Sequence, residues 1–261
     1  MNLKIESDLH IEFKNHEPDL SDVQVYVIAG DLGLFKNEKK WLIDLTNKYP
    51  NVEMVVVSGN HSFYDTNIEK VDRESRELSK QYERIHYLQN DSIVLNGFRF
   101  ITSTLWTDFN KGNPTAMYLA QARMNDYKQI RYHGGASRLT PYRVAILHKQ
   151  SKDYIFKTLN TSEEPCFVIS HHRPYIERNH MTDELSPAYE VDLLKELDKC
   201  KKLPIAWFHG HDHVSSTKII EYGHGSVEFI SNQKGYPNEE SGFDPNFIYI
   251  LNEDVLGLSN D

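Results

Sequence analysis

The chain has 261 residues, 39% of them hydrophobic, which is enough for one large core, and we expect residues 1–261 to form a single domain. Its formal net charge of −9 disfavours a protein that coats nucleic acid, because such binding needs a positive field that displaces counterions from phosphates. Having only two cysteines argues against a disulfide framework. The sequence has no apolar stretch of about 18 residues, which argues against a membrane span, and no basic leader, which argues against an export signal. We therefore expect a cytoplasmic protein.

Short apolar runs alternate with longer segments of helical spacing through most of the chain. In chain order, the pattern predicts strands at Leu3–Ile5 and Val23–Ile28, a helix at Glu38–Tyr49, a strand at Val52–Val57, a helix at Asn67–Arg84, a strand at Phe98–Thr102, a helix at Pro141–Leu159, a strand at Cys166–Ile169, a helix at Pro187–Cys200 and a strand at Ile205–Phe208. This alternation predicts an α/β fold with helices packed on the faces of the strands.

Two regions depart from this alternation. Residues 106–138 form the least periodic stretch, broken by glycines and a proline. Because long irregular segments in compact domains tend to carry function, this stretch is either a substrate-facing loop or lid, or a surface excursion without a role in function. The tail carries strand-like pieces at Thr217–Glu221, Ser226–Ile230 and Phe247–Leu251, joined by glycine-rich turns, and it predicts a second, more antiparallel sheet.

Side chains that can hold a metal ion follow several of the predicted strands. The fragments are Ser7-Asp8-Leu9-His10, Ala29-Gly30-Asp31-Leu32, Ser58-Gly59-Asn60-His61, His171 after its strand, and the run from Trp207 to His213. One Asp-x-His pair is expected by chance, so position carries the argument. Residues two apart in an extended segment point to the same side, and open α/β sheets place ligand sites at the carboxyl ends of strands. We therefore expect these side chains to converge.

The order Asp-x-His, Gly-Asp, Gly-Asn-His, a lone histidine after a strand and Gly-His-x-His resembles the calcineurin-like metallophosphoesterase superfamily, with the motifs spread from Asp8 to His213. The resemblance implies a four-layer α/β/β/α sandwich of two mixed β-sheets flanked by helices, with a dinuclear metal site at strand ends. It also implies a metal-dependent hydrolase of phosphate mono- or diesters that uses a metal-bridging hydroxide as nucleophile. More loosely, Thr104–Asp108 and Ser231–Tyr236 look like elements of small stand-alone phosphoesterases in this superfamily.

Carried over motif by motif, the resemblance assigns a role to eight residues. One ion would be held by Asp8, His10, Asp31 and His213, and the other by Asp31, Asn60, His171 and His211. His61 would be the catalytic histidine that binds no metal and protonates the departing oxygen or stabilises the transition state. Of His171 and His172, the family pattern favours the first as ligand, so His172 packs or contacts substrate.

The donor set and its charge indicate the ion and the substrate. Imidazole, carboxylate and amide donors without thiolate suit two divalent transition-metal ions, manganese first, with iron, zinc, cobalt or nickel as alternatives. The positive charge of two such ions exceeds the negative charge of Asp8, Asp31 and a bridging hydroxide taken together. The site would therefore be positive within an acidic protein and would attract a small phosphorylated substrate.

The chain departs from the family in ways that leave open what orients His61. Several family members carry an acidic residue directly after Gly-Asn-His, where this chain has Ser62. The protein phosphatase branch has an aspartate three residues after the Gly-Asp carboxylate, where this chain has Leu34, which disfavours a Ser/Thr protein phosphatase. Asp65 could substitute, but a solvated loop carboxylate is the simpler interpretation. Arg173 and Arg178 could bind a phosphate bidentately, although solvated surface arginines are simpler.

Two other classes of protein compete with the enzyme. The first is a non-catalytic, metal-binding protein-interaction scaffold on the same fold, but such scaffolds are expected to lose ligands or the histidine at position 61, and none is missing. The second is a purely structural metal site, which usually closes its coordination with cysteine and histidine. Within the enzyme class, nuclease, cyclic nucleotide phosphodiesterase and nucleotide phosphatase stay open, and the acidic balance favours small molecules over nucleic acid.

Overall fold

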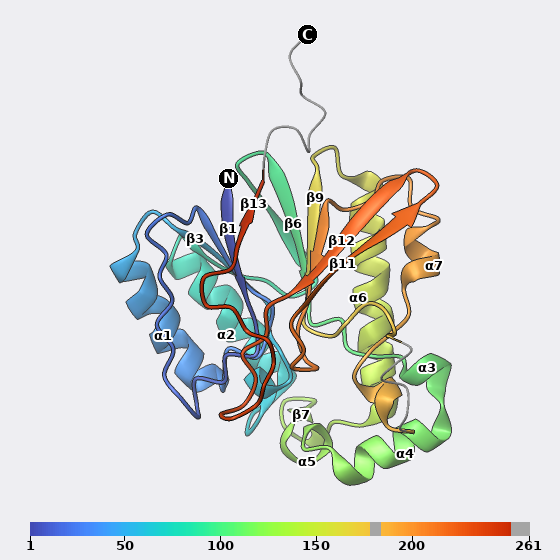
Figure 1. Cartoon of the computed structure of the whole chain (residues 1–261). Coiled ribbons are helices and arrows are strands. Elements are labelled where there is room, and N and C mark those ends of the chain that lie inside the picture. The colour runs from blue at the N-terminus through green and yellow to red at the C-terminus, as the bar shows by residue number, and fades with distance from the viewer. Residues whose placement is uncertain (178–183, 252–261) are drawn as a thin grey trace.

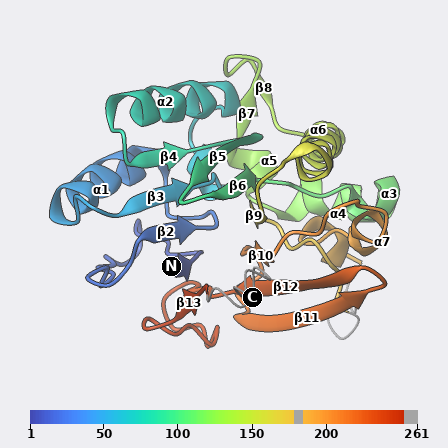
Figure 2. The same cartoon turned by 90° about the horizontal axis from the view of Figure 1, so that it is seen from above.

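Two β-sheets pack face to face and carry helices on their outer faces (Figures 1 and 2). The computed structural model describes residues 1–177 and 184–251. The first sheet has the order β13-β1-β2-β3-β4. Its strands are β1 (Asn2–Glu6), β2 (Val25–Ile28), β3 (Glu53–Val56), β4 (Ile85–Tyr87) and β13 (Ile248–Ile250). The first four are parallel, and β13 runs antiparallel to β1 at the edge.

The second sheet has the order β11-β12-β10-β9-β6-β5. Its strands are β5 (Asp91–Leu95), β6 (Phe98–Ser103), β9 (Cys166–Ser170), β10 (Ala206–Phe208), β11 (Ser216–Tyr222) and β12 (Gly225–Ser231). The four central strands are parallel, whereas β5 and β11 pair antiparallel at the edges. Both sheets are therefore mixed.

Alternation along the strands builds the layers. In β2, Val25 and Val27 face the second sheet, while Tyr26 and Ile28 face the helices, because successive side chains of a strand point to opposite faces. The helices α1 (Phe35–Lys48) and α2 (Ile68–Gln81) cover the first sheet, and α6 (Pro141–Thr161) covers the second. The order helix, sheet, sheet, helix confirms the predicted four-layer fold.

The long helices begin where local chemistry predicts. Asn67 lies just before α2 and its side chain accepts a hydrogen bond from the backbone N–H of Lys70 at 2.9 Å. Thr140 caps α6 in the same way, and Pro141 occupies the first helical position, where its missing N–H costs no hydrogen bond. These two helices follow the predicted ranges within a few residues.

The expectation of an irregular stretch at residues 106–138 is wrong. The stretch contains α3 (Phe109–Gly112), α4 (Pro114–Arg123), α5 (Asp126–Gln129), β7 (Arg131–Tyr132) and β8 (Ser137–Arg138). Only Ala116 and Ala120 of α4 are buried, so this helix lacks the apolar stripe that makes a helix visible in a sequence. Asn113 and Pro114 supply the cap and first position instead.

The helix expected at Pro187–Cys200 is also wrong. A 3₁₀ turn (Ser186–Ala188) and the short α7 (Leu194–Leu197) are its helical parts. Between them the chain is extended, because the N–H of Val191 and of Leu193 donate to the carbonyls of Arg173 and Pro174. Pairing with this neighbouring segment displaces the helix that the local pattern favours.

The tail does not build a separate sheet. The strands β11 and β12 form an antiparallel hairpin, as expected, but β12 pairs parallel with β10 and extends the second sheet. The last strand, β13, crosses to the first sheet and pairs with β1. None of the helices in residues 1–177 and 184–251 combines the length and apolar character that a membrane-spanning helix requires.

Candidate metal centre

The carboxyl ends of five parallel strands meet at one edge of the two sheets. Asp8 follows β1, Asp31 follows β2, and Asn60 with His61 follow β3; His171 follows β9, and His211 with His213 follow β10. Backbone hydrogen bonds tie neighbouring ends together. The N–H of Asp8 donates to the carbonyl of Gly30 at 3.1 Å, and the N–H of Gly210 donates to that of His171 at 2.9 Å. The structure thus brings together every residue that the motifs single out.

Three motif glycines make this close approach geometrically possible. A Cβ atom at Gly59 would lie 2.0 Å from Oδ1 of Asp31, and one at Gly210 would lie 2.4 Å from Oδ2 of Asp8. At Gly30, a Cβ would lie 2.3 Å from Nδ1 of His171. Each glycine therefore leaves room for a polar side chain from a neighbouring strand end.

One group of donor atoms forms around His10 and His213. Their Nε2 atoms lie 3.1 Å apart. Oδ1 of Asp8 lies 3.5 Å from Nε2 of His213, and Oδ2 of Asp31 lies 4.0 Å from Nε2 of His10. Two imidazoles and two carboxylates thus face a common point.

A second group forms around His171. Its Nε2 lies 3.0 Å from Oδ1 of Asn60, 3.1 Å from Nδ1 of His211 and 3.4 Å from Oδ2 of Asp31. Its Nδ1 lies 3.0 Å from the carbonyl of Ala29, which fixes the ring. Asp31 belongs to both groups, so its carboxylate stands where one side chain could serve two ions.

These donors fit divalent cations. Lone pairs of buried nitrogen and oxygen atoms crowd together, an arrangement that is unfavourable unless positive charge lies between them. Four overlapping groups of three histidine and aspartate side chains each bring their donor atoms within 4.8 Å of one another. In addition, Nε2 of His211 is buried and has no hydrogen-bond partner among the described residues. Imidazole, carboxylate and amide donors without thiolate suit transition metals.

The pKa shifts of these groups show the same demand for positive charge. Burial alone would raise the pKa of Asp31, but the imidazoles of His171 and His61 outweigh burial and hold it well below its usual value. Burial would lower the pKa of His171, yet the carboxylate of Asp31 raises it to about 9. Asp8 acts on His213 in the same way and raises its pKa to about 9. The cluster thus favours cations, whether protons or metals.

His61 lies beside the first donor group, with a ring nitrogen within 4.8 Å of the donor atoms of His10 and Asp31, but both of its ring nitrogens have partners that the motifs do not include. Its Nδ1 lies 2.9 Å from Oε1 of Glu12, and its Nε2 lies 2.9 Å from the hydroxyl of Tyr236. Its backbone N–H donates to Asp31 at 2.8 Å. Glu12 lies in the turn that follows His10, where the backbone is not extended, so the strand periodicity that was expected to align Asp8 with His10 does not mark it. Tyr236 comes from the distant tail, and no local signal marks it.

The residues considered earlier as partners of His61 have other contacts. Ser62 is buried and donates a hydrogen bond to Glu38 of α1 at 2.7 Å, which ties the turn after β3 to that helix. Leu34 precedes the first residue of α1. Asp65 is exposed, in line with a solvated loop carboxylate.

Asp126 of α5 is a second residue that the sequence did not reveal. Its Oδ1 accepts hydrogen bonds from Nδ2 of Asn60 at 3.0 Å and from the hydroxyl of Tyr64 at 2.6 Å. Holding the NH₂ group of Asn60 in this way turns its Oδ1 toward His171. The segment 106–138 therefore reaches the donor cluster from outside.

The interpretation of Arg173 as a solvated surface residue is wrong, whereas its contact with a phosphate stays a prediction, since Arg173 lines the cavity described below. Its side chain is 1% exposed and forms ion pairs with Asp212, Glu177 and Glu190. Asp212 stands between His211 and His213 and also accepts a hydrogen bond from Gln233. Arg173 thus anchors the segment that carries two of the expected ligands. Arg178 lies outside the described residues.

The remaining histidines near the motifs pack. The ring of His172 stacks on that of His211 with centroids 4.0 Å apart, and its Nδ1 lies 3.2 Å from the carbonyl of Thr104. His209 is fully buried against Tyr175, and burial lowers its pKa to about 3. His224 is exposed in the turn between β11 and β12.

The family model of the calcineurin-like phosphoesterases matches residues 1–215, a span that includes every motif from Asp8 to His213. The chain belongs to this family. Its members hydrolyse phosphoesters with divalent metal ions, which agrees with the donor groups of this chain.

Two individual proteins resemble this chain along nearly its whole length. The uncharacterized protein L509 of Acanthamoeba polyphaga mimivirus is 27% identical over 284 residues, covering 97% of this chain and 98% of L509. The crystal structure of phosphopantetheinyl hydrolase from Mycobacterium tuberculosis superposes with a TM-score of 0.67 at 16% identity, covering 92% of this chain and 93% of that one. The second likeness shows a shared fold.

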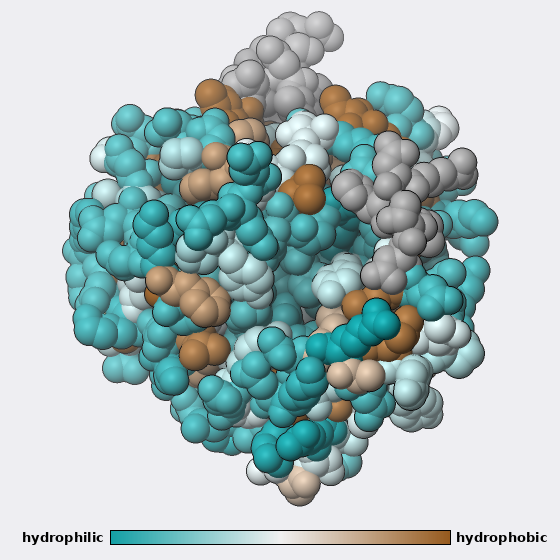
Figure 3. Space-filling model, turned by 60° about the horizontal axis from the view of Figure 1, so that its bottom comes forward, coloured by the Kyte–Doolittle hydropathy of each residue, from teal (hydrophilic) through white to brown (hydrophobic). Residues whose placement is uncertain are grey.

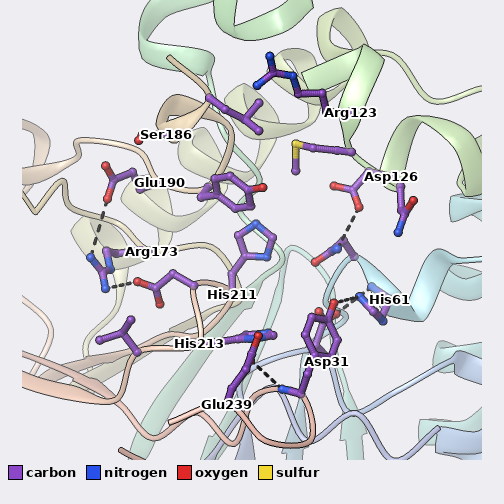
Figure 4. Close-up of a pocket in the computed structure, with 18 of the residues that line it drawn as sticks. Asp31, His61, Arg123, Asp126, Arg173, Ser186, Glu190, His211, His213 and Glu239 are labelled. Carbon is purple, nitrogen blue, oxygen red and sulfur yellow. Dashed lines mark hydrogen bonds and ion pairs between the residues drawn. The ribbon is translucent and has the colours of Figure 1, made fainter. Parts of the chain in front are cut away.

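A cavity of 560 Å³ opens onto the donor groups (Figure 4). The strand-end residues Asp31, Asn60, His61, His211 and His213 line its inner part. Aromatic and apolar side chains line the walls together with the carboxylates of Asp126, Glu190, Asp212 and Glu239, while Arg123 and Asn125 contribute from the end of α4 and the residues that follow it. Figure 3 shows a hollow near the middle of a mostly hydrophilic face. The cavity has the size of a site for an organic ligand, so it leaves room for a substituent beyond one phosphate.

Proposed function

We propose that this chain hydrolyses phosphate mono- or diesters with two divalent ions. Asp8, His10, Asp31 and His213 would hold one ion, and Asp31, Asn60, His171 and His211 would hold the other. The observation that carries this proposal is the convergence of these seven side chains around the shared carboxylate of Asp31. When bound, the ions would make a water molecule more acidic and draw negative charge from the phosphoryl oxygens. Manganese is our first choice of ion.

The residues of the chain position His61 for proton transfer to the departing oxygen. Glu12 accepts from Nδ1 of His61, which leaves Nε2 as the nitrogen that faces the cavity. Burial would raise the pKa of Glu12, but hydrogen bonds from His10 and His61 outweigh it and lower the pKa to about 2. The carboxylate therefore stays charged and stabilises a protonated imidazole, as a general acid requires. A substrate would take the place of the Tyr236 hydroxyl at Nε2.

We further propose that residues 1–261 form one phosphoesterase domain in which the segment 106–138 faces the substrate. Side chains from both sheets contribute to the same apolar layer between them, which supports a single unit. Arg123, Asn125 and Asp126 line the cavity, which supports a role of their segment in binding. The mixed walls suit an organic phosphoester in preference to inorganic phosphate alone.

Activity measurements on metal-loaded protein test this function. Protein stripped with a chelator and reloaded with manganese should hold two ions and should hydrolyse bis(p-nitrophenyl) phosphate or p-nitrophenyl phosphate. His61→Ala should lower kcat by about 10²–10⁴-fold and leave the metal content unchanged. His224→Ala, which removes an exposed imidazole on a distant turn, is the matched control. No turnover of either ester with manganese, iron, zinc, cobalt or nickel, in protein that holds two ions, would contradict the proposal.

A further inference from the structure

Residues 109–147 carry a charge opposite to that of the whole chain. They contain six lysines and arginines and a single carboxylate, which is the buried Asp126. The cations are Lys111, Arg123, Lys128, Arg131, Arg138 and Arg143. A segment with a formal charge of +5 thus stands in a chain whose net charge is −9. Such local asymmetry points to an anionic partner.

None of these cations forms an ion pair with a described carboxylate, a state that they share with other lysines of the chain such as Lys36 and Lys157. Elsewhere, lysines and arginines such as Lys39, Arg84 and Arg99 form ion pairs with glutamates. Within residues 1–177 and 184–251, none of the six cations lies within ion-pair distance of a carboxylate. Their charges are thus available to a ligand.

The hairpin of β7 and β8 sets two of these charges against each other. Arg131 and Arg138 are direct partners in its register, and both are exposed. Like charges directly opposite each other destabilise a pair of strands. An anion that bridges the two guanidinium groups would remove this repulsion, so the hairpin is arranged as an anion site.

Residues 109–147 reach the cavity through Arg123 and the residues that follow it. Arg123 lines the cavity on the side away from Asp31, as Figure 4 shows. The ammonium of Lys128 donates to the carbonyl of Arg123 at 3.1 Å, so the next cation lies at the end of α4. From there α5 leads directly into β7. In Figure 3, strongly hydrophilic side chains gather between the hollow and the lower edge of the molecule, where α4, α5 and β7 lie.

Aromatic side chains accompany the cations. Tyr118 and Tyr142 are each 73% exposed, the most exposed large hydrophobic side chains among the described residues. The guanidinium of Arg143 lies over the ring of Tyr132, 5.7 Å from its centroid. Exposed aromatic rings among arginines suit the binding of unpaired bases, which stack on rings while the cations contact phosphates.

We propose that residues 109–147 bind single-stranded nucleic acid and guide it to the metal centre. This inference rests on the proposed phosphoesterase function and names a substrate class for it. A polynucleotide supplies both what the segment attracts and what the centre cleaves, because its anionic groups are themselves phosphodiesters. The net negative charge of the chain does not oppose this binding, since charges beyond the Debye length of about 8 Å are largely screened at physiological salt.

Fluorescence anisotropy with labelled oligo(dT) and oligo(U) tests the binding. The protein would be metal-loaded His61→Ala, in which turnover is low. Adding Arg131→Ala and Arg138→Ala should raise the Kd about tenfold or more. It should also lower the slope of log K against log salt by about 1.4, since each phosphate contact to a single strand contributes about 0.7. If only one of the two probes binds in this way, that probe identifies the nucleic acid.

The control removes the same charge from elsewhere. Lys40 and Lys149 are exposed and pair with Asp44 and Asp153 along their helices. Lys40→Ala with Lys149→Ala should leave the Kd within twofold of the parent. An equal loss of affinity in both double variants would show that net charge alone drives binding and would overturn the proposal.

Other outcomes separate this inference from the proposed function. Binding of a duplex as tightly as of the single strand, or full displacement of the oligonucleotide by polyglutamate at equal charge concentration, would overturn it and indicate a general anion or acidic-protein surface. Turnover of bis(p-nitrophenyl) phosphate by the wild type without oligonucleotide binding would leave the function standing and refute the inference. Binding without any turnover would refute the function alone.

Discussion

The edge of the sheets that carries the donor groups and the segment 109–147 both line the same cavity, but their charged side chains differ in whether they have partners of opposite charge. At the edge, charged side chains are buried and contact one another, as Asp31 does with His171 and Arg173 with Asp212. In the segment, cations are mostly exposed and pair with no described carboxylate. In the two proposals, the chemistry belongs to the buried edge, which is organised before any ligand arrives, and recognition belongs to the exposed segment, whose cations would find their partners on the ligand.

The largest expected effect comes from the carboxylate common to both donor groups. Asp31→Ala should remove a ligand from each ion, so the metal content should fall well below two ions per chain and turnover should drop below detection. Metal analysis by mass spectrometry and the aryl phosphate assay would measure both. Asp65→Ala, an exposed aspartate outside the groups, is the control. A variant that kept two ions would show that Asp31 is not shared.

Glu12→Gln should lower kcat by about 10–100-fold at unchanged metal content, because a neutral amide no longer stabilises the protonated imidazole of His61. The loss should be greater for an alkyl phosphodiester than for the nitrophenyl ester, whose leaving group needs little protonation. Steady-state kinetics on the two substrates would measure the difference. Equal losses on both esters would mean that Glu12 supports the fold and not proton transfer.

Arg173→Lys should separate the anchoring of the 211–213 segment from phosphate binding. Lysine replaces the planar guanidinium group with a single ammonium, which weakens the contact with Asp212. Manganese affinity should therefore fall about 10–100-fold. The Ki of inorganic phosphate, measured at saturating manganese, should stay within twofold. The reverse result, with metal affinity intact and Ki raised, would make Arg173 a substrate ligand. Arg99→Lys provides the control, because Arg99 pairs with Glu164 on a surface ion pair.

An effect on folding and not on activity should appear in the pH dependence of stability. Burial raises the pKa of Glu38 to about 8, despite hydrogen bonds from Tyr87 and Ser62. The folded state therefore binds this proton more tightly than the unfolded chain, and stability should fall as pH rises from about 4.5 to 8, by up to about 1.4 kcal/mol per pH unit from this group. In urea unfolding of chelator-treated protein, Glu38→Gln should flatten this decline. Parallel curves for wild type and variant would contradict the assignment.

The smallest expected effect concerns the free energy of unfolding and comes from the β7–β8 hairpin in residues 109–147. Arg138→Thr should raise the free energy of unfolding by about 0.2–1 kcal/mol, because it removes the like-charge pair with Arg131. Arg138→Lys keeps the repulsion and should leave stability unchanged. Thermal unfolding of the two variants would measure the difference. Destabilisation by the threonine would show that Arg138 supports the hairpin in the free protein.

The sequence predicted the parts of the site that lie next to strand ends, and for a physical reason. Asp8, Asp31 and His171 each follow a buried apolar run, and parallel strands bring their carboxyl ends to one edge. Asp126 and Tyr236 join them through contacts across 66 and 175 residues of sequence, to Asn60 and His61. No local pattern encodes such pairings, so they had to be seen in three dimensions.

Secondary structure could likewise be predicted where a local sequence pattern marks it and was missed where it depends on distant contacts. The helices with an apolar stripe were predicted, whereas α4 buries only two alanines and was not. The residues after Pro187 favour a helix locally, yet extended pairing with Arg173 and Pro174 prevails. The strands β4 and β5 were also missed; β5 contains the apolar run Ile93-Val94-Leu95, but it lies at the edge of its sheet and none of its residues is fully buried.

The three motif glycines make the strand ends depend on one another. Gly59 leaves space for the carboxylate of Asp31, Gly210 for that of Asp8, and Gly30 for the imidazole of His171, so each motif is shaped to fit a side chain from a different one. A design that grafts this centre onto another scaffold would therefore fail if it copied the ligands alone. The transplanted unit has to be the set of adjoining strand ends, with their spacing and their empty Cβ positions.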